Sequence, residues 1–193
     1  YSPSLGITSV REAVAASLER RFGLPYRKEH IFMASGAAGA LAHAFRLVTE
    51  PGDEILTFAP FFPEYHPYVD LTGAALKVVP PDTESFQINF EAFKELLTEK
   101  VMAILINTPN NPSGVVYSDE TLKKLAEILR EKSEQYGHEI YLISDEPYRE
   151  IVFEGTKIPC VSQFYDNTIM CYSFSKSLSL PGERIGYVAV NPR

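Results

Sequence analysis

The sequence has few residues of the kinds that build disulfide-rich or metal-binding proteins. Its 193 residues include two cysteines, Cys160 and Cys171, which are too few for a disulfide framework and do not form a Cys-x-x-Cys pair. The four histidines are scattered along the chain and show no metal-ligand spacing. This cysteine usage predicts a reducing, cytoplasmic location.

Long apolar runs and runs of basic residues are also missing. No apolar stretch approaches the ~18 residues that a membrane-spanning helix needs, and no signal peptide is visible. The formal net charge is −7, so we expect neither nucleic acid nor an anionic membrane as a partner. With 45% hydrophobic and 22% charged residues, the composition is that of a soluble globular domain with one core.

Strand-like and helix-like segments alternate along the chain. The sequence predicts strands near residues 30–34, 54–59, 74–79, 101–106, 139–144, 168–173 and 185–190, and helices near residues 8–22, 37–49, 63–72, 89–99 and 118–136. For the first helix we expect Thr8 as the N-cap and Val10 on the apolar stripe.

This alternation indicates a mostly parallel sheet with helices on both faces. The last strand begins too soon after Lys176 to leave room for the dozen or so residues of a helical crossover, so we expect it to be antiparallel. The predicted fold is therefore α/β, a three-layer α/β/α sandwich around a seven-stranded, mostly parallel sheet with one antiparallel strand.

The segment 173–186 carries the most distinctive chemistry of the chain. It places Ser173 and Lys176 in the run Ser-Phe-Ser-Lys, and Arg184 follows with one residue between it and Gly186. A primary amine can form a Schiff base with an aldehyde, while hydroxyls and a guanidinium can hold a phosphate. Pyridoxal 5'-phosphate carries both an aldehyde and a phosphate. Taken alone, a surface lysine and an arginine in an ordinary ion pair would explain these residues as well.

The spacing Ser-x-Ser-Lys-x7-Arg-x-Gly resembles the lysine signature of the fold-type I, class I/II aminotransferases. The resemblance implies a pyridoxal 5'-phosphate cofactor held by Lys176 as a Schiff base, with Ser173 and Arg184 on its phosphate. It also implies a homodimer that moves an amino group between an amino acid and a 2-keto acid, with Lys176 transferring the proton. We expect burial and a cationic neighbour to favour the neutral form of this amine.

Two other segments place polar residues directly after an apolar strand. Asn111 lies in the turn Asn-Thr-Pro-Asn-Asn-Pro-Ser-Gly, and Asp145 and Tyr148 follow the strand near 139–144. Ligands gather at such carboxyl ends in open α/β sheets. By the resemblance, Asn111 and Tyr148 donate to the phenolic oxygen of the cofactor and Asp145 pairs with its pyridine nitrogen. Without the resemblance, these could be a plain turn, a turn cap and a core tyrosine.

The run Ala-Ser-Gly-Ala-Ala-Gly-Ala-Leu at residues 34–41 opens a predicted helix. Its free N–H groups and positive dipole end make an anion site. The resemblance assigns Gly36, Ala37 and Ala38 to the phosphate through their backbones. Many family members carry a hydroxyl or lysine side chain at the two alanines, so we expect this chain to depend more on its amides, on Ser173 and on Arg184.

Two residues complete the expected cofactor site. Phe62 follows the strand near 54–59, and the resemblance implies that its ring stacks on the pyridine ring, with Phe61 as the alternative. Because the chain has 12 phenylalanines, core packing is the competing explanation. Tyr1 opens a run that resembles the family's Tyr-x-x-x-x-Gly, which implies a contact with the phosphate bound by the other subunit.

The resemblance covers essentially the whole chain but only part of the family's length. We expect residues 1–193 to be the cofactor-binding large domain, without the N-terminal arm and without the small C-terminal domain that normally grips the substrate carboxylate. Such a chain would be a truncated form, a proteolytic product or an isolated domain. The same motifs serve C–S lyases, aminocyclopropane-carboxylate synthases and some decarboxylases. A domain that senses pyridoxal phosphate and an inactive fragment are further alternatives, and the amino donor is not identified.

Overall fold

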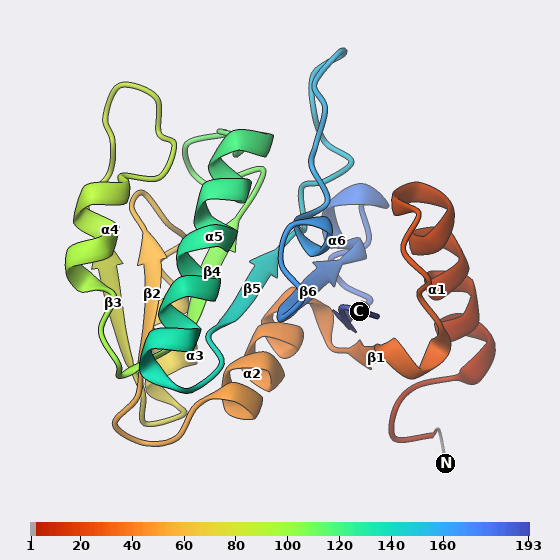
Figure 1. Ribbon diagram of the computed structural model, residues 1–193. Helices are drawn as coiled ribbons and strands as arrows, with labels where there is room; N and C mark the ends of the chain where they lie inside the picture. The colour runs from red at the N-terminus through yellow and green to blue at the C-terminus, as the bar shows by residue number, and fades with distance from the viewer. Residues whose placement is uncertain (1–2) are drawn as a thin grey trace.

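Seven short strands rich in aliphatic residues pair into one sheet in the computed structural model, which describes residues 3–193 (Figure 1). The strands are β1 (Ile31–Ala34), β2 (Glu54–Phe58), β3 (Ala75–Val79), β4 (Val101–Asn107), β5 (Tyr141–Asp145), β6 (Thr168–Ser173) and β7 (Gly186–Val190). Their order across the sheet is β1-β7-β6-β5-β4-β2-β3. The strand β7 pairs antiparallel with both neighbours, and the other pairs are parallel, which confirms the predicted topology.

The helices cover both faces of this sheet, so the predicted three layers are confirmed. They are α1 (Thr8–Phe22), α2 (Gly36–Val48), α3 (Tyr65–Asp70), α4 (Phe90–Leu96), α5 (Asp119–Tyr136) and α6 (Phe174–Ser177). The helices α2 and α3 pack over a core that includes Phe45 and Leu105. On the opposite face, α4 and α5 enclose Phe93 and Ile104. The helix α1 covers the β1–β7–β6 end of the sheet through a separate cluster that includes Leu18.

Local sequence signals account for both ends of α5. The side chain of Ser118 accepts a hydrogen bond from the Thr121 N–H at the start of α5, and Gly137 ends this helix in the left-handed conformation. The prediction for α1 is wrong in two details, because Thr8 is its first helical residue and Ile7 the N-cap. Val10 is 39% exposed, since it lies away from the buried stripe of this helix.

The sequence did not predict α6, the single turn that carries Lys176. The other boundaries differ from the predicted ones by at most three residues. Four residues are too few for a periodic pattern. The turn begins after its N-cap Ser173, whose side chain accepts a hydrogen bond from the Ser175 N–H.

Three parallel strands end at the same edge of the sheet and thereby position the site. Asn107, the last residue of β4, lies opposite Asp145, the last residue of β5. Asp145 in turn lies opposite Cys171 of β6, two residues before Ser173. The start of α2 reaches the same edge because Gly186 of β7 has no side chain. A Cβ at Gly186 would lie 2.4 Å from the Tyr172 carbonyl oxygen and 2.7 Å from the carbonyl carbon of Gly36.

We expect Gly186→Ala to lower the free energy of unfolding by about 1–3 kcal/mol, because the added methyl group overpacks backbone atoms that cannot rotate away. Urea unfolding followed by circular dichroism measures this. The matched control is Gly39→Ala inside α2, where the nearest atom to the new Cβ would be the Ser35 Cβ at 3.4 Å, an ordinary van der Waals contact. The Gly39→Ala substitution should instead raise the free energy of unfolding by about 0.5–1 kcal/mol. Equal effects of the two substitutions would contradict the close-approach role of Gly186.

Candidate functional site

A cavity of about 360 Å³ opens at the carboxyl ends of β4, β5 and β6. Its lining comes from five separate segments of the chain. Nine of the eleven residues predicted from the sequence line it: Ala37, Ala38, Phe62, Asn111, Asp145, Tyr148, Ser173, Lys176 and Arg184. Of the other two, Gly36 lies just behind the lining, and Tyr1 is outside the described residues. The fold therefore brings the predicted residues together in one place.

The start of α2 forms one end of the cavity. The N-cap residue Ser35 makes no side-chain hydrogen bond to this helix, so the first N–H groups keep their positive field. Gly36 has φ +69°, a left-handed conformation that favours glycine. A Cβ at Gly36 would lie 2.7 Å from Nη2 of Arg184. Gly36 thus leaves room for the Arg184 guanidinium directly over the N-terminus of α2. The guanidinium and the helix N-terminus together form a site that can bind an anion.

Arg184 is held in an unusual backbone conformation at this end. Its φ is +52°, which costs a non-glycine residue about 1–3 kcal/mol. Its Nη1 donates to the Pro181 carbonyl oxygen at 3.1 Å. Within residues 3–193, no carboxylate lies within ion-pair distance of this guanidinium. The ordinary ion pair that would have explained Arg184 is therefore not present in the described chain.

The turn that carries Lys176 is built on two serine hydroxyls. The buried Ser173 Oγ accepts from the Ser175 N–H at 3.1 Å and donates to the Ser175 Oγ at 2.8 Å. The hydroxyl of Ser173 is therefore engaged within the turn, and the proton of the Ser175 hydroxyl remains available to a ligand. Tyr172 donates to the Ser177 Oγ at 2.7 Å and ties the far end of α6 to β6.

The expected burial of Lys176 is wrong for the described chain, because its side chain is exposed. The physical reason is its place on a single helical turn at the cavity mouth, followed by the exposed segment 178–185. Its amine therefore reaches the cavity from the solvent side.

Asp145 supplies a buried carboxylate at the opposite end of the cavity. Its Oδ2 accepts a hydrogen bond of 2.7 Å from the Tyr65 hydroxyl, whereas its Oδ1 has no partner among residues 3–193. Burial raises the pKa of Asp145 to about 7, the Tyr65 hydrogen bond lowers it, and the charge of Glu146 raises it. A buried polar atom without a partner costs about 1–3 kcal/mol, so Oδ1 is suited to a charged donor such as a protonated pyridine nitrogen.

Asn107, which the sequence analysis missed, joins the two polar strand ends. Its Nδ2 donates to the Asp145 carbonyl oxygen at 2.8 Å, and its Oδ1 accepts from the Asn111 N–H at 2.7 Å. The available signal was its place as the polar end of an otherwise apolar strand. Tyr65 and Tyr68, from the helix α3, were missed as well, and no local pattern separates them from core aromatics.

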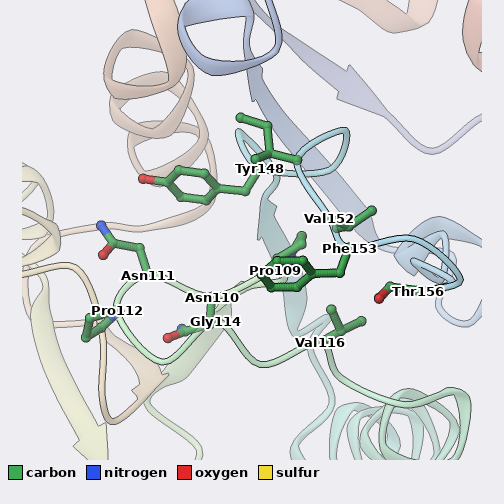
Figure 2. Close-up of a pocket in the computed structure, with 11 residues that line it drawn as sticks. Pro109, Asn110, Asn111, Pro112, Gly114, Val116, Tyr148, Val152, Phe153 and Thr156 are labelled. Atoms are coloured by element: carbon green, nitrogen blue, oxygen red, sulfur yellow. The ribbon is translucent and has the colours of Figure 1, made fainter.

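Asn111 and Tyr148 form the side wall of the cavity. Figure 2 shows their polar ends pointing to the same side, away from Phe153. Burial and the charge of Asp145 raise the pKa of Tyr148, and a hydrogen bond with Asn111 opposes this. The aromatic residue Phe62 lines the cavity, and its ring meets that of Tyr65 edge-on, with centroids 5.6 Å apart.

A second cavity of about 330 Å³ lies behind this wall and shares Asn111 and Tyr148 (Figure 2). The rest of its lining is mostly apolar and belongs to the loop 109–116 and to the segment 151–156. This segment is part of the connection between β5 and β6, which extends away from the sheet (Figure 1). Tyr148 is its one titratable lining residue among those described. The chemistry therefore lies in the first cavity.

Among residues 3–193, no helix is both long enough and apolar enough to cross a membrane. Across this described part of the chain, no group of three or more His, Cys, Asp and Glu side chains is placed to hold a metal ion.

Comparison with known proteins agrees with this geometry. The chain is 38% identical to a probable aspartate/prephenate aminotransferase of Aquifex aeolicus, over 98% of this chain and 48% of that protein. It is 36% identical to an aspartate aminotransferase of Thermotoga maritima, over 97% and 49%. A crystal structure of an amino transferase from Eubacterium rectale matches with a TM-score of 0.98 at 49% identity, covering 100% of this chain and 48% of that chain. The chain thus spans about half the length of these relatives.

The family model described as aminotransferase class I and II matches residues 1–193. Sequence, sheet order and overall superposition all lead to one group of proteins. The chain belongs to the class I and II aminotransferase family.

Proposed function

We propose that this protein is an aminotransferase that uses pyridoxal 5'-phosphate to move an amino group between an L-amino acid and a 2-keto acid. One observation carries the proposal: a single cavity holds a lysine amine, a buried carboxylate whose Oδ1 has no partner among residues 3–193, and an arginine over a helix N-terminus. These groups match the aldehyde, the ring nitrogen and the phosphate of the cofactor. The names of the relatives from Aquifex aeolicus and Thermotoga maritima support an amino-group transfer.

The phosphate would bind at the start of α2. The N–H groups of Gly36, Ala37 and Ala38 and the guanidinium of Arg184 offer hydrogen bonds and positive charge. Ser175 adds a hydroxyl, and Ser173 holds that hydroxyl in place. Because the two alanines offer no side-chain donor, Arg184 would supply most of the charge that binds the phosphate.

The ring would lie between Phe62 and the polar wall. Asp145 would hold the ring nitrogen through Oδ1, and Asn111 and Tyr148 would donate to the phenolic oxygen. When bound, pyridoxal phosphate supplies a cationic ring that withdraws electrons from the α-carbon of the substrate. The carboxylate of Asp145 stabilises that positive charge, and the protonated nitrogen in turn would lower the pKa of Asp145.

Lys176 would act at the reacting atoms. Its Nζ would hold the aldehyde end of the cofactor. As a free amine, it would accept the proton of the substrate α-carbon and give that proton up again. The base leaves this cycle in the protonation state in which it entered.

We also propose that residues 1–193 form the cofactor-binding large domain of a cytoplasmic homodimer. Large apolar side chains are exposed beside the cavity mouth at Leu178, Leu180 and Ile185. A partner subunit over this face would exclude water from the exposed Lys176. The two cysteines are free and buried, which agrees with a reducing compartment.

Adding pyridoxal phosphate to the protein should produce a new, pH-sensitive absorption band in the near-visible region, and Lys176→Ala should abolish that band. Turnover of L-aspartate with a 2-keto acid should fall to background in the same variant, because no other lysine among residues 3–193 lines the cavity. The matched control is Lys157→Ala, which removes an exposed lysine that does not line the cavity. A band or a turnover rate that survives Lys176→Ala would sink the proposal.

The phosphate contact can be tested by comparing two ligands. Arg184→Gln should weaken binding of pyridoxal phosphate roughly 10- to 100-fold, the range for losing a charged hydrogen bond. Binding of pyridoxal, which lacks the phosphate, should change little. Arg46→Gln, an exposed arginine at the other end of α2, serves as the control. Equal losses for the two ligands would exclude a phosphate-specific role for Arg184.

A further inference from the structure

We propose that Tyr65 is a positioning residue for this site: its hydroxyl holds one oxygen of Asp145 so that the other stays aimed at the ring nitrogen of the cofactor. The inference rests on the proposed function and deepens it. It concerns a residue that none of the sequence motifs marks, on a helix that supplies no other polar contact to Asp145 among the described residues.

The contact joins two distant parts of the chain inside the core. Tyr65 is the first residue of α3 and is 1% exposed, and Asp145 ends β5 and is 5% exposed. The Tyr65 hydroxyl donates to the Asp145 Oδ2 at 2.7 Å. Its ring is held on two sides, because Phe61 stacks on it at an interplanar angle of 14° and Phe62 meets it at 79°. The hydroxyl therefore has little freedom to leave the carboxylate.

This bond makes the two carboxylate oxygens different. Oδ2 is engaged by Tyr65, whereas Oδ1 has no partner among residues 3–193 and belongs to a residue that lines the cavity. Asn107 fixes the main chain beside it through the Asp145 carbonyl oxygen. With one oxygen and the backbone both held, rotation of the carboxylate is restricted. A ring nitrogen therefore meets an oxygen that is already in place.

The hydroxyl also acts on the charge of Asp145. Burial raises the pKa of this carboxyl to about 7, and the Tyr65 hydrogen bond is the contribution that lowers it. The titratable groups that face Asp145 are Glu146 and Tyr148 on its own turn, Cys171 on β6, and Tyr65 and Tyr68 on α3; Lys176 and Arg184 line the same cavity. Near neutral pH, Tyr65 thus increases the fraction of Asp145 that carries the charge a pyridinium requires.

The test is Tyr65→Phe, measured in two ways. In the cofactor-free protein, ¹³C NMR of labelled aspartate carboxyls, assigned with Asp145→Asn, should show the pKa of Asp145 raised above its parent value of about 7. At pH 7, absorption titration should show pyridoxal phosphate bound about tenfold more weakly, the loss expected for one hydrogen bond to a charged group. This difference should shrink at higher pH, because Asp145 is then ionised in both proteins.

The control is Tyr165→Phe, which removes an equivalent hydroxyl elsewhere. Tyr165 is 3% exposed and donates to the Ile140 carbonyl oxygen at 2.7 Å, in the core on the opposite face of the sheet. The Tyr165→Phe substitution should leave the pKa of Asp145 and the affinity for pyridoxal phosphate unchanged. If the two phenylalanine variants weaken binding equally, the loss is structural and the positioning role is wrong.

The outcomes separate this inference from the proposed function. If the parent binds no pyridoxal phosphate, the proposed function fails, whereas the NMR titration still decides whether Tyr65 controls Asp145. If the parent binds it and Tyr65→Phe binds and titrates like the parent, the positioning role fails and the proposed function stands.

Phenylalanine keeps the ring between Phe61 and Phe62, and circular dichroism checks the fold of the variant. Should this variant not fold, proton NMR of the parent replaces it. The Tyr65 hydroxyl proton should exchange slowly with water and shift as Asp145 titrates near pH 7. A hydroxyl signal that does not respond to that titration would overturn the inference.

Discussion

Asp145 ends a parallel strand inside the protein, where its carboxylate has lost most of its water and one of its oxygens has no partner among the described residues. Desolvation of this group opposes its charge, so the ionised form needs compensation from its surroundings. Tyr65 provides part of it through Oδ2, and a cationic ligand in the cavity would provide the rest through Oδ1. The site is thus built around a charge that the protein alone leaves incompletely stabilised.

The sheet places that charge opposite a complementary field. Parallel strands β4, β5 and β6 end together, so the carboxylate, the Asn107 amide and the lysine turn all lie at one edge. At the other end of the cavity, a helix N-terminus and the Arg184 guanidinium offer positive charge. One ligand with a cationic ring and an anionic tail would match both ends at once. Gly36 and Gly186 make this arrangement sterically possible, because β7, α2 and Arg184 meet where any Cβ would collide.

The mouth of the cavity differs in character from its interior. Asp145 and Ser173 are buried, whereas Lys176 and Arg184 are exposed and are flanked by exposed apolar side chains. In the proposed reaction, excluding water from the amine that moves the proton would strengthen the electrostatic interactions at that amine. A protein surface that covers this face would shield Lys176 from water. The exposed apolar side chains beside it would become buried in such a contact.

Local pattern in the sequence was enough to predict the layers and the antiparallel last strand, whereas nine of the cavity-lining residues were predicted from the resemblance to the aminotransferases. Apolar runs that end in polar clusters mark the strands and their carboxyl ends, and the short connection after Lys176 excludes a crossover. Contacts between residues far apart in the sequence could not be predicted from local pattern. Tyr65 meets Asp145 across 80 positions, and Asn107 joins two loops only because β4 and β5 pair in one register. Whether Lys176 is buried, and which serine hydroxyl remains free, depended on packing around a single turn, which no periodic pattern in the chain encodes.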